Sequence, residues 1–182
     1  MLIRFSTATS RKAADAVLLD ANVLITAHSQ YYPIDQVPEF WGWLQHQAAS
    51  GHVKIPLEIM EEIRAGRMAG DPLIEWILQD ANYDALLFLE AVDAAVVQHV
   101  VNDGYAPDLT DDEIEKIGRD PFLIAYALAS PADRCVITTE VSRPSKQRSN
   151  RKIPDVCNAF DVQCFGPFVL NRNLGFRTGW RS

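Results

Sequence analysis

The chain has 182 residues, of which 48% are hydrophobic and 23% are charged, a composition typical of one soluble globular domain. Its net charge of −7 excludes a general nucleic-acid coat protein, because such a protein is basic overall. Three cysteines without a C-x-x-C pair argue against a structural zinc site and indicate a reduced, cytoplasmic protein. No apolar run is long enough to span a membrane, so we expect no membrane association.

The first strand is predicted at Val17-Leu18-Leu19, a short apolar run that leads directly into Asp20. Such a run is typical of a buried strand in a parallel sheet. Asp20 then stands at the carboxyl end of the strand, where open α/β sheets bind their ligands. Two interpretations stay open here: Asp20 binds a divalent cation, or it caps the helix that begins near Asn22.

A helix, a strand and a second helix are predicted next. Apolar residues recur at helical spacing over residues 39–49, and a short strand is predicted over 52–56. The helix over 57–65 has an apolar side and an acidic side. A solvated face explains most of its acids, but we keep Glu62 as a candidate because its helix follows a strand.

The middle of the chain is predicted to be mostly helical. Asp71-Pro72 opens one helix, because Asp is a frequent N-cap and proline fits the first helical position. Apolar residues at helical spacing predict a longer helix over about 82–101. Thr110 and Glu113 form a capping box that opens a short acidic helix at the surface.

A core helix and another strand carry the next two acids. Asp120-Pro121 opens a nearly all-apolar helix, so Asp120 stands at the mouth of the core, although a plain N-cap also accounts for it. Residues 135–139 form an apolar strand, and Glu140 follows it as Asp20 follows the first strand. The arrangement of a strand that ends in a carboxylate therefore occurs twice.

A basic loop follows Glu140. Residues 143–152 contain five bases and no acid in a chain that is acidic overall. Directly after an acidic strand end, such a loop is well placed to hold phosphates, although a solvated loop accounts for it as well. The candidate phosphate contacts are Arg143, Lys146, Arg148, Arg151 and Lys152.

The rest of the chain completes one domain. A short helix is expected near Ile153 with Asp155 in its first turn, and the last strand is expected at 162–165. We expect an amino-terminal extension at 1–16, a globular domain at 17–170 and a basic carboxyl-terminal tail at 171–182.

Strands that alternate with helices predict a three-layer α/β fold, with a mostly parallel central sheet flanked by helices. Parallel strands end at one edge, so acids from separate parts of the chain would converge there. Carboxylates packed that closely repel one another, which implies a neutralising cation. Because the candidate ligands are all oxygens, we expect Mg²⁺ or Mn²⁺ rather than zinc. The candidate ligands are Asp20, Glu62, Asp120, Glu140 and Asp155.

Four stretches in this order resemble the motifs of the PIN-domain ribonucleases. They are residues 18–23, 62–66, 120–127 and 136–140. The box Ile153-Pro154-Asp155-Val156-Cys157 is similar to one in a PIN subfamily whose members are regarded as VapC-like toxins of bacterial toxin–antitoxin pairs. The resemblance covers roughly residues 17–170 and implies a PIN-like fold.

The resemblance also implies roles for single residues. Asp20, Glu62 and Asp120 match the acidic triad of the family. Glu140 falls where many members have a fourth Asp, and Asp155 is the alternative ligand at that point. Asn22 matches a position that orients the first carboxylate, and Thr138 or Thr139 matches a hydroxyl position that supports the site.

The implied activity is hydrolysis of RNA phosphodiester bonds by a water bound to Mg²⁺ or Mn²⁺, with RNA and a cognate antitoxin as partners and a homodimer left open. Two other functions stay open at this level. A degenerate PIN fold could act only as a protein-binding module, although the three acids of the triad are present. An aspartyl-phosphate phosphatase also begins with an Asp at a strand end, but it needs a second carboxylate where this chain has Asn22.

Overall fold

A five-stranded sheet forms the centre of the structure, a computed structural model in which residues 16–66, 68 and 70–181 are described. Its strands are β1 (Val17–Leu19), β2 (Val53–Pro56), β3 (Leu87–Phe88), β4 (Cys135–Ile137) and β5 (Gln163–Phe165), in the spatial order β3-β2-β1-β4-β5. Each neighbouring pair is parallel. The predicted α/β fold is therefore confirmed, whereas residues 1–15 of the predicted amino-terminal extension lie outside the described residues.

β1 lies in the middle of the sheet because its side chains are apolar on both faces. Val17, Leu18 and Leu19 are each at most 1% exposed, as expected for a strand that helices cover on both sides. Leu18 pairs with Lys54 of β2 and with Val136 of β4. Since all strands run the same way, the residues that follow β1, β2 and β4 meet at one edge of the sheet.

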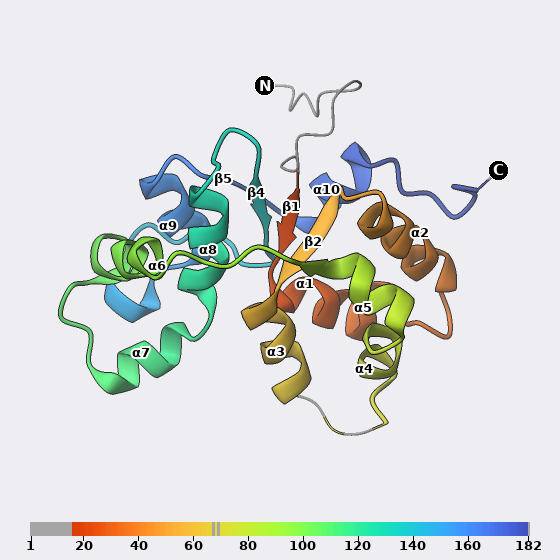
Figure 1. Ribbon diagram of the computed structural model, residues 1–182, viewed down its shortest axis with the longest axis horizontal. Coiled ribbons are helices and arrows are strands. Elements are labelled where there is room, and N and C mark those ends of the chain that lie inside the picture. Colours follow the sequence, from red (N-terminus) through yellow and green to blue (C-terminus); the bar gives the residue numbers. More distant parts are fainter. Residues whose placement is uncertain (1–15, 67, 69, 182) are drawn as a thin grey trace.

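Helices cover both faces of the sheet, with α6 to α9 on one side and α1, α2, α4, α5 and α10 on the other (Figure 1). The helical segments are α1 (Ala21–Thr26), η1 (Ala27–Tyr31), α2 (Pro38–Ala49), α3 (Leu57–Ala65), α4 (Pro72–Ile77), α5 (Asp80–Leu86), α6 (Ala94–His99), η2 (Val100–Tyr105), α7 (Asp111–Ile117), α8 (Asp120–Leu128), η3 (Arg148–Asn150), α9 (Ile153–Ala159) and α10 (Pro167–Asn173). In the part of the chain that the structure describes, no helix has both the length and the apolar character needed to cross a bilayer.

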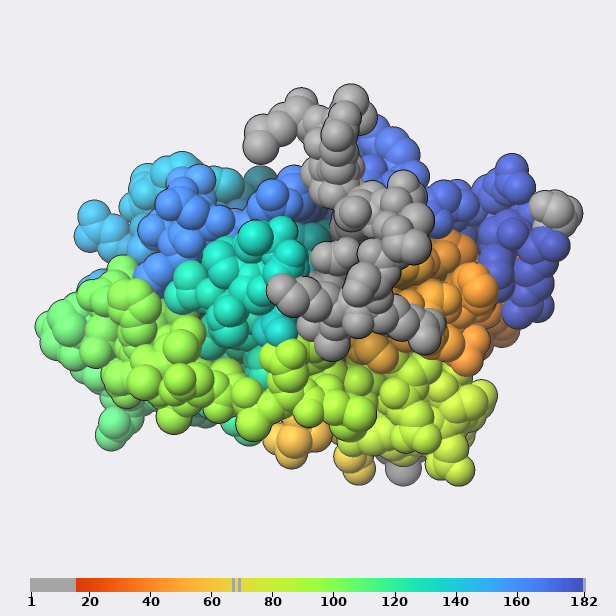
Figure 2. Space-filling view, turned by 45° about the horizontal axis from the view of Figure 1, so that its top comes forward, coloured from red at the N-terminus to blue at the C-terminus, as the bar shows by residue number. Residues whose placement is uncertain are grey.

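The predicted helix over 82–101 is wrong, because the chain forms several shorter elements there. α5 ends at Leu86, the edge strand β3 then pairs with β2, and α6 begins at Ala94. The side chain of Asp93 caps α6 by accepting a 2.8 Å hydrogen bond from the backbone N–H of Ala95. Pairing with β2 thus outweighs the helical spacing of the apolar residues. Figure 2 shows this part of the chain as a yellow-green to green band across one face of the molecule.

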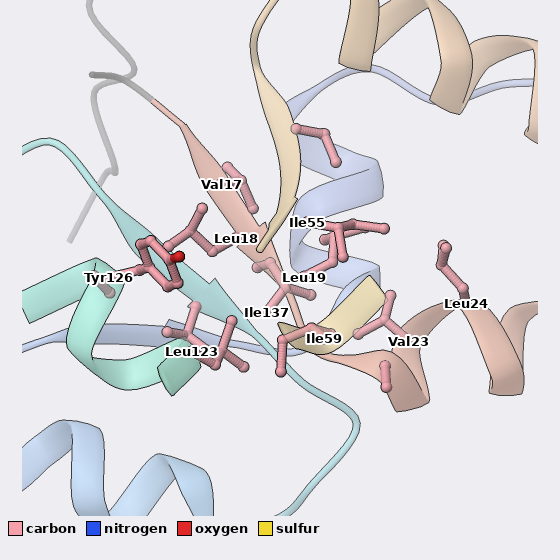
Figure 3. Close-up of a cluster of buried hydrophobic side chains, with 14 of the residues drawn as sticks. Val17, Leu18, Leu19, Val23, Leu24, Ile55, Ile59, Leu123, Tyr126 and Ile137 are labelled. Carbon is pink, nitrogen blue, oxygen red and sulfur yellow. The ribbon is translucent and has the colours of Figure 1, made fainter. Parts of the chain in front are cut away.

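α8 packs directly on the sheet, where it contacts β1, β2 and β4. Nearly all of its side chains are apolar, as expected for a helix that is buried on most sides. Figure 3 shows Leu123 and Tyr126 of α8 on one side of β1, with Val23 and Leu24 of α1 on the other. This packing fixes the first residue of α8, Asp120, near the carboxyl edge of the sheet.

The carboxyl-terminal segment packs on the domain. Asn171 is buried, and its side-chain amide donates a 3.2 Å hydrogen bond to the Tyr32 hydroxyl. The ring of Phe176 lies 5.2 Å from the ring of Phe40 and 5.1 Å from that of Trp43, both on α2. The predicted boundary at residue 170 therefore does not separate a tail from the domain.

Gly104 of η2 permits a close contact with α9, because a Cβ atom there would lie 2.8 Å from Val156 Cγ1 and 2.9 Å from Phe160 Cε2. We predict that Gly104→Ala lowers the free energy of unfolding by about 1–3 kcal/mol, the usual cost of overpacking a core. Urea denaturation measures this change. Gly66→Ala is the control, because a Cβ there makes only an ordinary 3.5 Å contact, and its effect should stay within about 0.5 kcal/mol. Equal stability of Gly104→Ala and the wild type would contradict the close contact.

Candidate functional site

Four carboxylates from separate parts of the chain interact at the carboxyl edge of the sheet. Asp20 follows β1, Glu62 lies on α3, Asp120 begins α8, and Glu140 follows β4. The pKa of Asp120 is raised well above its ordinary value, first by burial and then by the charges of Asp20, Glu140 and Glu62. The structure therefore brings Asp20, Glu62 and Glu140 within electrostatic reach of Asp120.

Asp20 is the most deeply buried of the four, with 2% of its surface exposed. Burial raises its pKa, and the charge of Glu140 adds to the rise, while the Thr138 hydroxyl and the backbone N–H of Asn22 oppose it. Thr138 Oγ1 donates a 2.7 Å hydrogen bond to Asp20 Oδ2. The Asp20 side chain makes no capping hydrogen bond of normal geometry to α1, so helix capping does not account for its position.

Glu62 lies on the solvent side of the group, where its side chain is exposed. Partial desolvation raises its pKa first, the charge of Asp20 adds to the rise, and Arg119 opposes it. The neighbouring Glu61 instead lies 4.0 Å from Arg119 in an exposed ion pair. The two adjacent glutamates of α3 thus have different surroundings, and of the two only Glu62 interacts with Asp20 and Asp120.

Glu140 is held by the last residue of the basic loop and by the residue after it. Lys152 Nζ lies 2.6 Å from Glu140 Oε1, and the backbone N–H of Ile153 donates a 2.9 Å hydrogen bond to Oε2. The positive charge of Lys152 also lowers the pKa of Asp120. Lys152 therefore offsets part of the negative charge of the group.

The donor set suits a hard divalent cation, but the acids do not form a finished site. Among residues 16–66, 68 and 70–181, no three His, Cys, Asp or Glu side chains lie close enough together to hold a metal ion. Even so, the charges of Asp20, Glu140 and Glu62 raise the cost of ionising Asp120, and a bound cation would offset that repulsion. Carboxylate oxygens are the donors that hard divalent cations such as Mg²⁺ and Mn²⁺ prefer, so these residues are the candidates for holding such an ion.

Asp155 does not join the group. The Ser142 hydroxyl donates to Asp155 Oδ1, and the backbone N–H of Arg143 donates a 2.7 Å hydrogen bond to Oδ2. The carboxylate thus fixes the start of the basic loop onto α9. This placement favours Glu140 over Asp155 as the fourth acid.

Arg148 holds the basic loop against the region around α7. Its guanidinium donates 2.7 Å hydrogen bonds to the carboxylates of Glu113 and Asp108. The hydrogen bond from Arg148 lowers the pKa of Glu113 to about 2, with the backbone N–H of Thr110 as the second cause. Arg148 was predicted to contact RNA, but in the structure two carboxylates already occupy its donors.

Of the other bases of the loop, some side chains hydrogen-bond within the protein and some do not. Arg151 donates to the backbone carbonyl oxygens of Gly104 and Asp155, so it ties the loop to η2 and α9. Arg143 and Lys146 are exposed, and their side chains make no hydrogen bond or ion pair with the described part of the chain. Among the five predicted phosphate contacts, these two are the ones open to a ligand.

Two of the three predicted supporting residues act on Asp20, though not in the same way. Thr138 is 1% exposed and links the two strand-end acids, because its hydroxyl also accepts a 3.1 Å hydrogen bond from the backbone N–H of Glu140. Asn22 acts through its backbone N–H, while its side chain is exposed. Thr139 instead lines an apolar pocket with Leu19 of β1 and with residues of α1 and α10.

Tyr105 lies beside the acids and was not predicted from the sequence. It is 6% exposed, and its buried hydroxyl has no hydrogen-bond partner among the described residues. Burial raises its pKa, and the charges of Asp120 and Glu140 contribute to the rise. In the sequence, Tyr105 simply follows Asp103-Gly104 near the end of a predicted helix. No spacing pattern connects it with Asp120, so sequence patterns could not identify it.

Comparison with known proteins gives a family but no activity. The model of a family described as a domain of unknown function, DUF4411, matches residues 17–178. No curated protein and no solved structure matches the chain. The matched range includes the five strands and the four interacting acids.

The raised pKa of Asp120 makes stability depend on pH. Below pH 3.8, the ordinary pKa of Asp, the Asp120 carboxyl is protonated in both the folded and the unfolded chain, and the folded state carries no cost of ionisation. This advantage of the folded state is lost as the pH rises through the raised native pKa. Because Asn does not ionise, we predict that metal-free Asp120→Asn is more stable than the wild type at neutral pH. The difference should shrink as the pH falls toward 3.8. Thermal melts with a chelator at several pH values measure it. A variant that is less stable at neutral pH would refute the interpretation.

Proposed function

We propose that this protein, which belongs to the DUF4411 family, is an endoribonuclease that hydrolyses RNA phosphodiester bonds with Mg²⁺ or Mn²⁺. The observation that carries the proposal is the electrostatic interaction of the partly buried Asp120 with Asp20, Glu62 and Glu140. Carboxylates that lie close together without a bound cation destabilise the fold. Their proximity is therefore better explained by a role in binding a ligand than by a role in stabilising the structure.

Asp20 and Asp120 are the residues best placed to hold the cation. Thr138 holds the Asp20 carboxylate in place by donating to Oδ2. Asp120 is held by the packing of α8 on the sheet. Glu140 adds a third charge, and its bonds to Lys152 and Ile153 keep it in place.

A divalent cation held by Asp20 and Asp120 would lower the pKa of a water and would stabilise the charge that develops on the leaving oxygen. Glu62 is suited to orient that water or to accept its proton, because it lies on the solvent side of the group with a raised pKa. Asp20 is buried and Asp120 is partly buried, and the reduced contact with bulk water strengthens their hold on a positive charge.

RNA is the proposed substrate because the loop that follows Glu140 carries exposed bases. Arg143 and Lys146 belong to the loop that Asp155 and Arg148 hold in place. Bases on a fixed loop can contact phosphates of a bound strand without reading its sequence. The net charge of −7 argues that contact with RNA is confined to such a local patch.

The proposal extends to biological role through the resemblance to VapC-like toxins. On that basis the protein is the toxin of a bacterial toxin–antitoxin pair, and a cognate antitoxin is its protein partner. This part rests on the sequence motifs, above all the box at 153–157. The alternative, a protein-binding module without catalysis, makes the opposite prediction in the experiment below.

The test is cleavage of RNA by the purified full chain with Mg²⁺ or Mn²⁺. We predict that Asp120→Asn lowers cleavage by more than about 100-fold, because groups that only support a metal ligand already cost about 10–100-fold when removed. Sequencing of RNA 5′ ends, with single-stranded DNA of the same sequence as a comparison, identifies the cut sites and the substrate class.

Glu62→Gln and Glu61→Gln form a matched pair on α3. Cleavage should fall in Glu62→Gln, whereas Glu61→Gln should cleave as the wild type does, because Glu61 pairs with Arg119 outside the group. Unchanged cleavage in Asp120→Asn, or cleavage that persists with a chelator, would exclude the proposed site. A wild type that binds the cation but cuts neither RNA nor DNA would favour the binding module.

A further inference from the structure

An unpaired hydroxyl lies buried next to the acids. Tyr105 is 6% exposed, and its oxygen has no hydrogen-bond partner in residues 16–66, 68 and 70–181. A buried hydroxyl without a partner loses its hydrogen bonds to water and gains nothing in exchange, so such groups are normally paired. The missing partner of Tyr105 therefore needs an explanation.

Tyr105 belongs to a segment that packs against α8, which carries Asp120, and against α9. It is the last residue of η2, which contacts both α8 and α9. Asp120 begins α8, and the charges of Asp120 and Glu140 both act on the tyrosine hydroxyl. The hydroxyl is thus close to two of the four acids.

The backbone before Tyr105 is held in place on one side by α9. Arg151 donates to the carbonyl oxygen of Gly104, and the missing side chain of Gly104 lets η2 approach Val156 and Phe160. These contacts fix the direction in which the next side chain leaves the backbone. The position of the Tyr105 hydroxyl is therefore built into the packing.

We propose that Tyr105 is a positioning residue whose hydroxyl donates a hydrogen bond to the Asp120 carboxylate once Asp120 turns toward a bound divalent cation. The inference rests on the proposed function. A carboxylate that binds a metal through one oxygen is commonly oriented by a hydrogen-bond donor at the other. The phenol remains a donor at neutral pH, because burial and the neighbouring charges raise its pKa. This hydrogen bond to Asp120 would also give the Tyr105 hydroxyl the partner that it lacks.

Tyr105→Phe in the full chain tests the inference, because it removes the hydroxyl and keeps the ring. Two quantities are measured: the melting temperature in chelator, and the Mn²⁺ affinity from the rise of that temperature during a Mn²⁺ titration. We expect metal-free Tyr105→Phe to be at least as stable as the wild type, since no hydrogen bond is lost. We expect its Mn²⁺ affinity to fall by about 10–100-fold.

Tyr126→Phe is the matched control. Tyr126 is also buried, but its hydroxyl donates to the Glu90 carbonyl oxygen at 3.2 Å and lies 3.5 Å from Glu58 Oε1. The control should therefore melt at a lower temperature than the wild type without metal and bind Mn²⁺ with unchanged affinity. Together the two variants separate loss of a structural hydrogen bond from loss of metal binding.

Each outcome decides a different claim. Equal Mn²⁺ affinity in Tyr105→Phe and the wild type overturns the role of Tyr105 and leaves the metal site standing. A wild type whose melting temperature does not respond to Mn²⁺ overturns the metal site, and the role of Tyr105 with it. Weaker Mn²⁺ binding in Tyr105→Phe alone supports both.

Discussion

Repulsion among carboxylates at one edge of a parallel sheet is the constraint on which the site depends. The sheet brings the ends of β1 and β4 together, and α8 places Asp120 next to them. The charges of Asp20, Glu62 and Glu140 raise the cost of ionising Asp120, Glu140 does the same to Asp20, and burial is the largest cause for both aspartates. This electrostatic cost is concentrated at the carboxyl edge of the sheet, and that edge is therefore the candidate site for binding a cation.

The protein offsets part of the repulsion with its own groups. Thr138 connects Asp20 with the backbone of Glu140, and Lys152 forms an ion pair with the Glu140 carboxylate. Arg148 and Asp155 hold the two ends of the loop that leads to Lys152. These contacts fall short for Asp120, whose pKa stays raised. These bonds thus hold the residues around Asp120 in place, but they do not offset the whole cost of ionising Asp120.

Patterns within short segments predicted most of the fold. The apolar strands, the Asp71 and Thr110 caps and the parallel sheet were all predicted correctly, because burial on both faces and helix capping leave local signals. β3 was missed, since its two residues become a strand only by pairing with β2. In the site, strand ends pointed to Asp20 and Glu140, but contacts between distant segments decided the rest. Such contacts tie up Arg148 and place Tyr105 beside Asp120, and neither is encoded in spacing.

The most direct test of the account is anomalous diffraction from crystals of the full chain grown with Mn²⁺. The account predicts one strong Mn²⁺ peak bound by carboxylate oxygens of Asp20 and Asp120, with Glu62 or Glu140 reaching it directly or through water. A well-ordered site region with no Mn²⁺ between Asp20 and Asp120 would contradict the central claim.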